Sequence, residues 1–160
     1  MEDELMVRFG VCSLFTNVPI TKDLDIANKL LDSITQRKQR CLLGPSNITK
    51  AMDLCLYSTF FNFRDLYRQT KGEAMGLQVS PIIDNLLIHS SETSAVSKYP
   101  LSPKIWLRYV HDTFVIIKGD GLDELFININ SLSDKIQFTR KLESAEHRLP
   151  FLDCLVQKRM

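Results

Sequence analysis

The chain has 160 residues and a mass of 18.4 kDa, a length that suits one domain or part of a larger protein. Hydrophobic residues make up 44% of the sequence and charged residues 24%, which is enough apolar material for a core and excludes an intrinsically disordered chain. The 20 basic and 19 acidic residues give a net charge of +1. This balance excludes a uniformly basic nucleic-acid-binding protein but allows a local basic patch.

The N-terminus and the cysteines indicate the cellular compartment in which we expect the protein. Residues 2–4 are all acidic where a signal peptide needs basic residues. No stretch approaches the roughly 20 apolar residues of a membrane helix, so we expect no membrane association. The four cysteines contain no C-x-x-C pair and are far apart, which predicts reduced thiols. We therefore expect an intracellular protein, with the nucleus among its possible compartments.

The first half of the chain predicts a strand, two helices and a hairpin. Residues 7–14 are apolar and favour a strand. Apolar residues at helical spacing then predict a helix capped by Thr21 and, after a break, a second helix capped by Ser46. The side chains expected to face inward on the second helix are Ile48, Met52, Cys55 and Leu56. Alternation over residues 61–69 predicts a short hairpin.

The second half predicts a helix, a hairpin, another helix and further strands. A glycine-containing loop leads into a helix that opens at Ser80-Pro81. Two strands, 105–110 and 113–117, are separated by a tight turn at His111-Asp112. A helix over 122–132 and strands over 136–139 and 151–156 complete the chain. Antiparallel hairpins combined with helices on one face indicate an α+β fold.

Three segments hold residues that could take part in catalysis or ligand binding. The turn 109–112 places a carboxylate between two strands, although acidic residues are common in turns for purely local reasons. The loop 72–81 puts two glycines before a helix N-terminus, where a backbone can approach a ligand, but it matches no phosphate-binding fingerprint. The segment 9–19 is a strand running into a turn, with core packing as the default role of its apolar residues.

Together these segments resemble the palm of a reverse transcriptase, most closely that of the Penelope-like retroelements. That family carries motifs that read roughly D-V-x-S-L-F-T-N-x-P, F-x-F, Y-x-Q-x-x-G-x-A-M-G-x-x-x-S-P-x-x-x-N-L, W-x-R-Y-V-D-D-T-F, F-T and L-P-F-L-D, in this order. The resemblance runs from about residue 9 to residue 156. The matching residues are Val11, Ser13 to Asn17, Pro19, Phe61, Phe63, Tyr67, Gln69, Gly72, Ala74 to Gly76, Ser80, Pro81, Asn85, Leu86, Trp106, Arg108 to Val110, Asp112 to Phe114, Phe138, Thr139 and Leu149 to Asp153.

The resemblance implies a palm-like antiparallel sheet with helices packed on one face. It implies one reverse transcriptase domain of palm and partial fingers over residues 1–160, with thumb and endonuclease modules absent. The activity of the family is RNA-directed DNA polymerisation, with an RNA template, a DNA primer and a dNTP as partners. Two Mg²⁺ or Mn²⁺ ions held by carboxylates would assist the reaction.

The chain departs from the family at the metal-binding positions. Of the three Asp residues that hold the metals in the family, two are Gly10 and His111 here, and only Asp112 remains. Glycine offers no ligand, and imidazole suits Zn²⁺ or Mn²⁺ better than Mg²⁺. Loss of one stabilising contact often costs about 10²–10³ in rate. We therefore expect the metals not to be bound, Asp112 to be at most a weak metal ligand, and polymerase activity to be lost.

The resemblance also assigns roles around the nucleotide and the template. Phe15 would face the sugar, although core packing explains it equally well. The residues that would lie against the template or the incoming nucleotide are Gly72, Met75, Gly76, Gln78, Ser80, Pro81 and Tyr109. Asp84 stands where the family has a small residue. Because an unpaired buried carboxylate is costly, we expect Asp84 to be exposed or paired.

Three interpretations remain open at this point. The first is a truncated and catalytically inactive reverse transcriptase domain of a retroelement. The second is a non-catalytic domain of the same origin that binds nucleic acid or a protein partner. The third is a live enzyme in which Glu73 or Asp153 replaces the lost carboxylates, and nothing in the spacing supports it.

Overall fold

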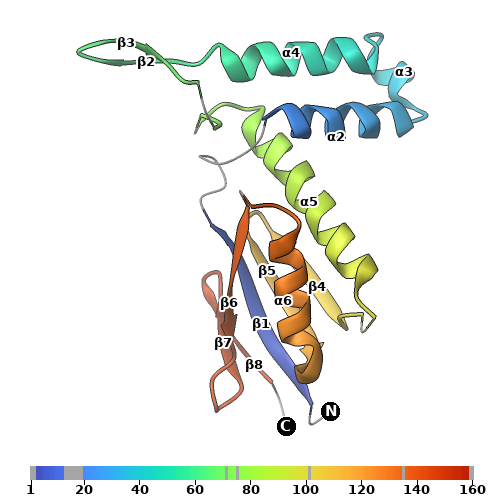
Figure 1. Cartoon of the computed structure of the whole chain (residues 1–160), viewed down its shortest axis with the longest axis vertical. Helices are drawn as coiled ribbons and strands as arrows, with labels where there is room; N and C mark the ends of the chain where they lie inside the picture. Colours follow the sequence, from blue (N-terminus) through green and yellow to red (C-terminus); the bar gives the residue numbers. More distant parts are fainter. Residues whose placement is uncertain are drawn as a thin grey trace. The chain divides into compact units, whose positions relative to one another are not determined.

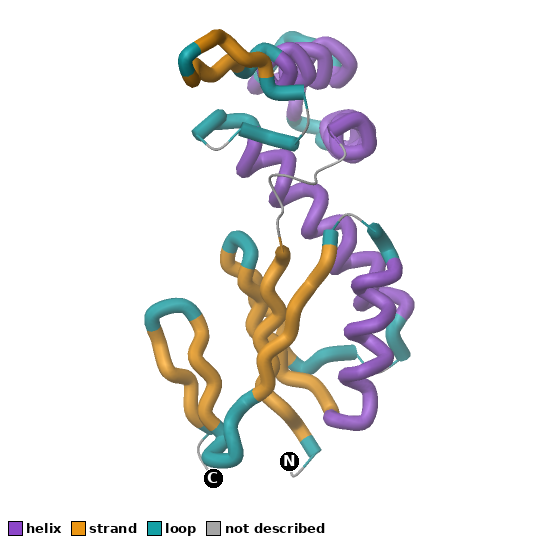
Figure 2. Tube along the Cα trace, turned by 60° about the vertical axis from the view of Figure 1, so that its left-hand side comes forward, coloured by secondary structure: helices purple, strands orange, loops and turns teal. Residues whose placement is uncertain are grey.

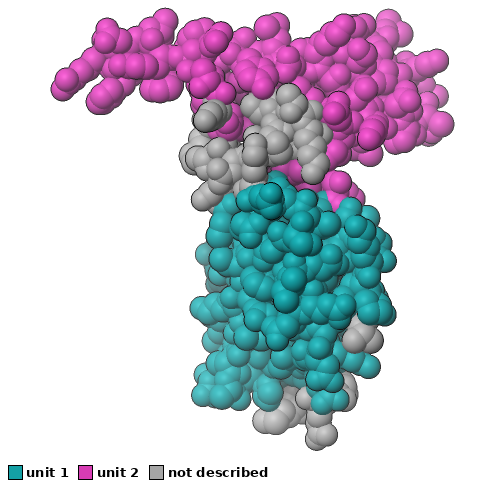
Figure 3. Space-filling view, viewed as in Figure 1, with its two compact units in different colours: residues 1–13, 91–160 teal, residues 14–90 magenta. Residues whose placement is uncertain are grey.

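The computed structural model describes residues 3–12, 20–70, 72–74, 76–100, 102–134 and 136–158. It divides into two compact units, which are coloured separately in Figure 3. Unit 1 comprises residues 1–13 and 91–160, and unit 2 comprises residues 14–90. In the described part of the chain, no helix is both long enough and apolar enough to cross a membrane.

Unit 1 is built on a four-stranded antiparallel sheet with the order β4-β5-β1-β6 (Figure 1). These strands are β1 (Glu4–Cys12), β4 (Ile105–Tyr109), β5 (Asp112–Lys118) and β6 (Gln137–Leu142). The first strand lies at the centre and pairs with two strands that are distant in the sequence. Successive side chains of a strand point to opposite faces, so one face of this sheet can be buried while the other is open.

Helices cover one face of this sheet, as Figure 2 shows for unit 1. They are the C-terminal part of α5 (Ser80–Lys98) and α6 (Leu122–Ser131), which follows a short 3-10 turn, η1 (Gly119–Gly121). Phe9 is fully buried on this face, with its ring centroid 5.8 Å from that of Trp106 and 6.1 Å from that of Phe126 of α6. The predicted α+β fold, with an antiparallel sheet and helices on one face, is therefore confirmed.

The other face is only partly covered, by the hairpin of β7 (Arg148–Phe151) and β8 (Cys154–Gln157). Leu149 of this hairpin is buried with Met6 and Phe114 of the sheet, and the rings of Phe151 and Phe114 meet edge to face at 5.5 Å. Beyond the hairpin the face is open, because Tyr109 of β4 is 62% exposed. At this end of the sheet Thr139 is also exposed, and Asp112 is partly exposed.

Unit 2 consists of helices and one projecting hairpin. The helices are α2 (Ile20–Ser33), α3 (Arg37–Arg40), α4 (Pro45–Tyr57) and the N-terminal part of α5. Helices α2 and α4 pack against each other, with Ala27 and Leu56 buried. The hairpin pairs β2 (Phe60–Phe63) with β3 (Asp65–Arg68), and all eight residues are exposed.

The predictions for the helix caps were wrong. Helix α2 already includes Ile20, so Thr21 lies inside the helix. Helix α4 begins at Pro45 and is capped by Gly44, so Ser46 does not cap it. Proline at the first helical position has the backbone angle that a helix needs and lacks only an N–H that would be unpaired anyway. Cys55, expected to face inward, is exposed.

The last two strand predictions needed one correction. Residues 136–139 fall in or next to β6, but residues 151–156 do not form one strand. They turn at Leu152, whose φ of 52° lies in the left-handed region, and this turn joins β7 to β8. Alternating apolar residues on both sides of a tight turn look like a continuous strand in the sequence.

Candidate functional site

The turn between β4 and β5 sits at the open end of the sheet in unit 1. Val110 has a φ of 52°, and the carbonyl oxygen of His111 accepts a hydrogen bond of 3.0 Å from the backbone N–H of Val11. Asp112 is already the first residue of β5. The turn is therefore displaced by one residue from the predicted His111-Asp112, and Asp112 is held by the sheet rather than by the turn.

Gly10 and Asp112 are direct partners in neighbouring antiparallel strands, and Thr139 of β6 faces Gly10 from the other side. A Cβ atom added at Gly10 would lie 3.4 Å from Oδ1 of Asp112 and 3.3 Å from Oγ1 of Thr139. A side chain at position 10 would thus approach the Asp112 carboxylate. The structure brings together Gly10 and Asp112, two of the three positions at which the resemblance implies metal ligands, and Gly10 carries no side chain.

Arg8 pairs with the Asp112 carboxylate, and sequence reasoning missed this ion pair. Its Nε and Nη2 atoms lie 2.9 and 2.8 Å from Oδ1 of Asp112. Arg8 and Gly10 share a face because they are two residues apart in one strand. Arg8 is therefore a diagonal neighbour of Asp112, within reach of a long side chain. The two-residue spacing from Gly10 indicated the shared face in the sequence, but the contact with Asp112 depends on the order of the strands.

The side chains present do not fit a pair of divalent metal ions. Throughout the described ranges, no three His, Cys, Asp or Glu side chains converge in a way that could hold a metal. Gly10 supplies no ligand, and the carboxylate of Asp112 is engaged by the Arg8 cation. Of the two substitutes considered from the sequence, Glu73 belongs to unit 2, and Asp153 lies in the turn between β7 and β8.

A buried polar cluster supports the turn from the helix side of the sheet. Glu92 of α5 is 5% exposed and accepts hydrogen bonds of 2.8 Å from Nε of Arg108 and from Oγ1 of Thr113. Arg108 also donates from Nη1 to the carbonyl oxygen of Val110 at 3.3 Å. The cluster ties both strands and their turn to the helix. It was not anticipated from the sequence.

The glycine-containing loop belongs to unit 2 and leads into α5. Gly72 and Gly76 have φ values of 68° and 95°, a backbone region that favours glycine. The hydroxyl of Ser80 donates to the carbonyl oxygen of Ala74 at 3.2 Å, which folds the loop onto the start of the helix. Gln78 and Pro81 are exposed.

The candidate site residues divide between the two units. Tyr109 lies beside the turn in unit 1 and pairs with Asp112 in the strand register. The residues from Gly72 to Pro81 belong to unit 2. Phe15 and Met75 lie outside the described residues. Unit 1 thus brings together Gly10, His111, Asp112 and Tyr109 only.

Asp84 of α5 contradicts its prediction. It was expected to be exposed or paired, yet its side chain is buried, and neither carboxylate oxygen has a hydrogen-bond partner in the described part of the chain. Burial raises the pKa of Asp84 from 3.8 to about 6, because the charged form loses its hydration.

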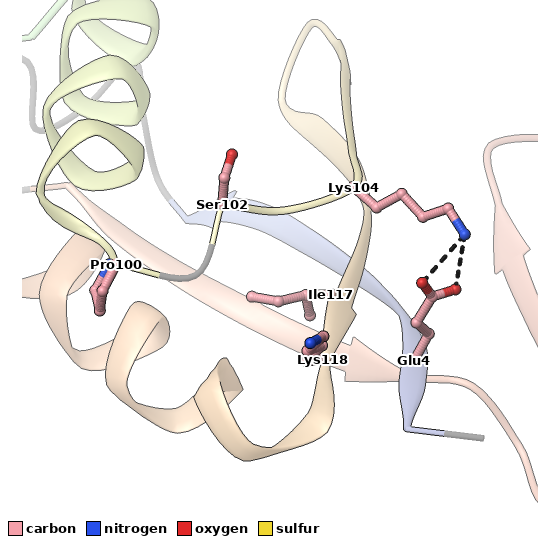
Figure 4. A pocket seen from close by; sticks show the side chains of 6 residues that line it. All are labelled: Glu4, Pro100, Ser102, Lys104, Ile117 and Lys118. Carbon is pink, nitrogen blue, oxygen red and sulfur yellow. Dashed lines mark hydrogen bonds and ion pairs between the residues drawn. The ribbon is translucent and has the colours of Figure 1, made fainter. Parts of the chain in front are cut away.

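A separate cavity of about 270 Å³ opens at the far end of the same strands (Figure 4). It is lined by Glu4, Pro100, Ser102, Lys104, Ile117 and Lys118. Nζ of Lys104 lies 3.1 and 3.0 Å from the two carboxylate oxygens of Glu4, and this hydrogen bonding lowers the pKa of Glu4. In the β1–β5 ladder the cavity is at the Glu4 end, whereas Asp112 is at the other. Nothing in the sequence analysis predicted this cavity.

Comparison with known proteins identifies the fold. No family model matches the chain, and no curated protein matches it. A solved structure of apo telomerase from Candida tropicalis, truncated from the C-terminal domain, superposes with a TM-score of 0.69 at 11% sequence identity. The match covers 96% of this chain and 34% of the telomerase chain. The chain has a reverse-transcriptase-like fold and spans about a third of the length of that telomerase.

Proposed function

We propose that this chain is a reverse transcriptase domain of a Penelope-like retroelement that does not catalyse DNA synthesis. The observation that carries the proposal is the pairing of Gly10 with Asp112, because it leaves one carboxylate where the family uses several. The order of the sequence motifs supports the retroelement origin. The likeness to telomerase supports the fold on which an RNA template, a DNA primer and a dNTP would be bound.

The chemistry of polymerisation explains why one carboxylate is insufficient. Two metal ions must hold both the attacking and the leaving oxygen of the phosphoryl transfer. Mg²⁺ needs oxygen ligands fixed in a nearly ideal geometry. Asp112 alone, paired with Arg8, cannot supply them. Because losing a single electrostatic contact often costs about 10²–10³ in rate, loss of both metals removes measurable polymerisation.

Mn²⁺ binding measured by water-proton relaxation tests this proposal. The unmodified chain is expected to behave like its Asp112→Asn variant, because Asp112 does not bind the ion. The Gly10→Asp/His111→Asp double variant is expected to bind Mn²⁺ more tightly than either, because it restores two carboxylates beside Asp112. The strand backbone of Gly10 accepts a side chain, provided that the Thr139 hydroxyl shifts by a few tenths of an ångström.

Circular dichroism of all three proteins serves as the folding control. Tight Mn²⁺ binding by the unmodified chain that disappears in Asp112→Asn, together with extension of a DNA primer on an RNA template, would show that the domain is an active polymerase. A folded double variant that binds no more Mn²⁺ than the unmodified chain, even when Arg8→Gln is added to it, would show that lost carboxylates do not explain the inactivity.

A second candidate function is metal-independent binding of single-stranded nucleic acid, and the β2–β3 hairpin favours it. Phe61 and Tyr67 stack at 5.5 Å on one face of the hairpin, and they are 51% and 46% exposed. Arg64 lies 6.0 Å above the ring of Phe63 at the hairpin turn. Exposed aromatic rings next to arginine are the features with which proteins stack bases and hold phosphates.

Fluorescence anisotropy with a labelled single-stranded RNA tests this second function. The Phe61→Ala/Tyr67→Ala variant is expected to bind about 10-fold more weakly, because base stacking contributes about 1–3 kcal/mol per base. Leu66→Ala is the matched control, since Leu66 is 72% exposed on the opposite face of the hairpin but has no ring to stack. Binding should also weaken as salt is added. Equal effects of the two changes, or self-association of the chain that depends on Phe61 and Tyr67, would contradict the nucleic-acid role.

A further inference from the structure

We propose that Arg8 is a built-in cation that takes the place of a metal ion beside Asp112 and keeps this end of the sheet closed to divalent metals. The proposal rests on the function proposed above, because it explains how the same site stays stable without its metals. It adds a residue that none of the sequence motifs includes.

The contact geometry places the positive charge of Arg8 beside Oδ1 of Asp112, an oxygen that would otherwise be able to bind a metal ion. Both Nε and Nη2 approach the same oxygen, Oδ1 of Asp112, at 2.9 and 2.8 Å. Side chains of the pair are only 35% and 23% exposed, so water screens their attraction incompletely. A divalent ion binding to Oδ1 would have to displace the guanidinium or tolerate its repulsion.

The same cation would engage a carboxylate restored at position 10. A Cβ atom at Gly10 would lie 3.4 Å from Oδ1 of Asp112, the oxygen that already accepts from Arg8. A guanidinium has five N–H donors and can serve two carboxylates at once. Two carboxylates bridged by Arg8 would form an ion-pair cluster rather than an open metal site. Reversing the losses at Gly10 and His111 should therefore restore metal binding only in part.

Lys141 provides a matched control on the same face of the sheet. It is the direct partner of Arg8 in the β1–β6 ladder, and its side chain is exposed. Among the described residues Lys141 forms no ion pair with Asp112. Removing Lys141 deletes the same unit of charge from the same face without touching the Arg8–Asp112 contact.

The test adds each change to the Gly10→Asp/His111→Asp double variant and follows Mn²⁺ titrations by water-proton relaxation at pH 7.5. Arg8→Gln, which keeps a hydrogen-bond donor but removes the charge, is expected to tighten Mn²⁺ binding by at least about 10-fold. Lys141→Gln is expected to change binding by less than about 3-fold. Arg8→Lys, which keeps the charge, is expected to leave the Mn²⁺ affinity close to that of the double variant.

The outcomes separate the role of Arg8 from the function on which it rests. Equal gains in Mn²⁺ affinity from Arg8→Gln and Lys141→Gln would overturn the proposal. They would show that only the total positive charge on this face of the sheet matters, not the contact between Arg8 and Asp112. A double variant that already binds Mn²⁺ as tightly as the Arg8→Gln triple variant would overturn it while leaving the proposed function intact. Tight Asp112-dependent binding by the unmodified chain would overturn both. Circular dichroism of each variant establishes that it is folded.

Discussion

Glu92→Met is expected to lower the free energy of unfolding of unit 1 by about 3–5 kcal/mol, the usual cost of removing one partner from a buried ion pair. The carboxylate of Glu92 is 5% exposed and binds both Arg108 and Thr113 at 2.8 Å. Without it, a guanidinium whose side chain is 15% exposed and a fully buried hydroxyl lose their partner together. The cost is the desolvation of these groups rather than the strength of the original pair.

Urea unfolding followed by tryptophan fluorescence measures this effect. Trp106 is the sole tryptophan of the sequence and lies in β4 of unit 1, so its emission reports on the sheet that Glu92 supports. Lys104→Met serves as the control, because it breaks the Lys104–Glu4 pair in which the lysine side chain is 56% exposed. That loss should be much smaller than the loss in Glu92→Met, because water screens an exposed ion pair. Similar losses in the free energy of unfolding for the two variants would show that the buried Glu92 cluster stabilises unit 1 no more than an exposed ion pair does.

A compensating variant separates the two causes of the loss. Glu92→Met/Arg108→Met replaces the buried pair with apolar side chains of similar length, and such replacements are often neutral. Most of the stability lost in Glu92→Met should return, except for the part due to the unpaired Thr113 hydroxyl. A double variant less stable than Glu92→Met would instead show that Arg108 stabilises the turn through its hydrogen bond to Val110.

The elements of the fold followed from the sequence because local patterns determine them. Two short β runs predicted the strands on either side of the turn at 110–111, and the β2–β3 hairpin was predicted within one residue of its observed bounds. The helix starts were less accurate, since Thr21 and Ser46 are common cap residues that happen to lie inside their helices. A local preference cannot decide between neighbouring residues that are both compatible with a helix start.

The polar contacts of the site could not be read from the sequence, because they join distant residues. Arg8 and Asp112 are 104 positions apart, and Glu92 lies 16 and 21 positions from its two partners. Because side chains alternate along a strand, the sequence shows which residues of one strand share a face of the sheet. Which residue of another strand they contact depends on the order of the strands. With the order β4-β5-β1-β6 known, the diagonal contact between Arg8 and Asp112 follows directly.

Asp84→Asn is expected to stabilise the protein at neutral pH by about 1–3 kcal/mol, the range set by a rise in pKa of this size. Asp84 is 2% exposed, and neither of its carboxylate oxygens has a hydrogen-bond partner within the described residues. Burial raises its pKa from 3.8 to about 6, so the folded protein holds this proton more tightly than the unfolded chain. The free energy of unfolding should therefore fall as the pH rises from about 4 to about 6 and remain low above that.

The variant removes this pH dependence because asparagine has nearly the same shape but carries no charge. Urea midpoints followed by circular dichroism should rise in Asp84→Asn at pH 7.5 and match those of the unmodified chain at pH 4. Asp32→Asn, which changes an exposed carboxylate of the same unit, is the control and should show little effect at either pH. A gain of equal size at both pH values would mean that the gain does not arise from the charge of Asp84. A loss of stability at pH 7.5 would mean that the carboxylate has a favourable partner, and that the charge placed on this helix face is compensated in the folded protein.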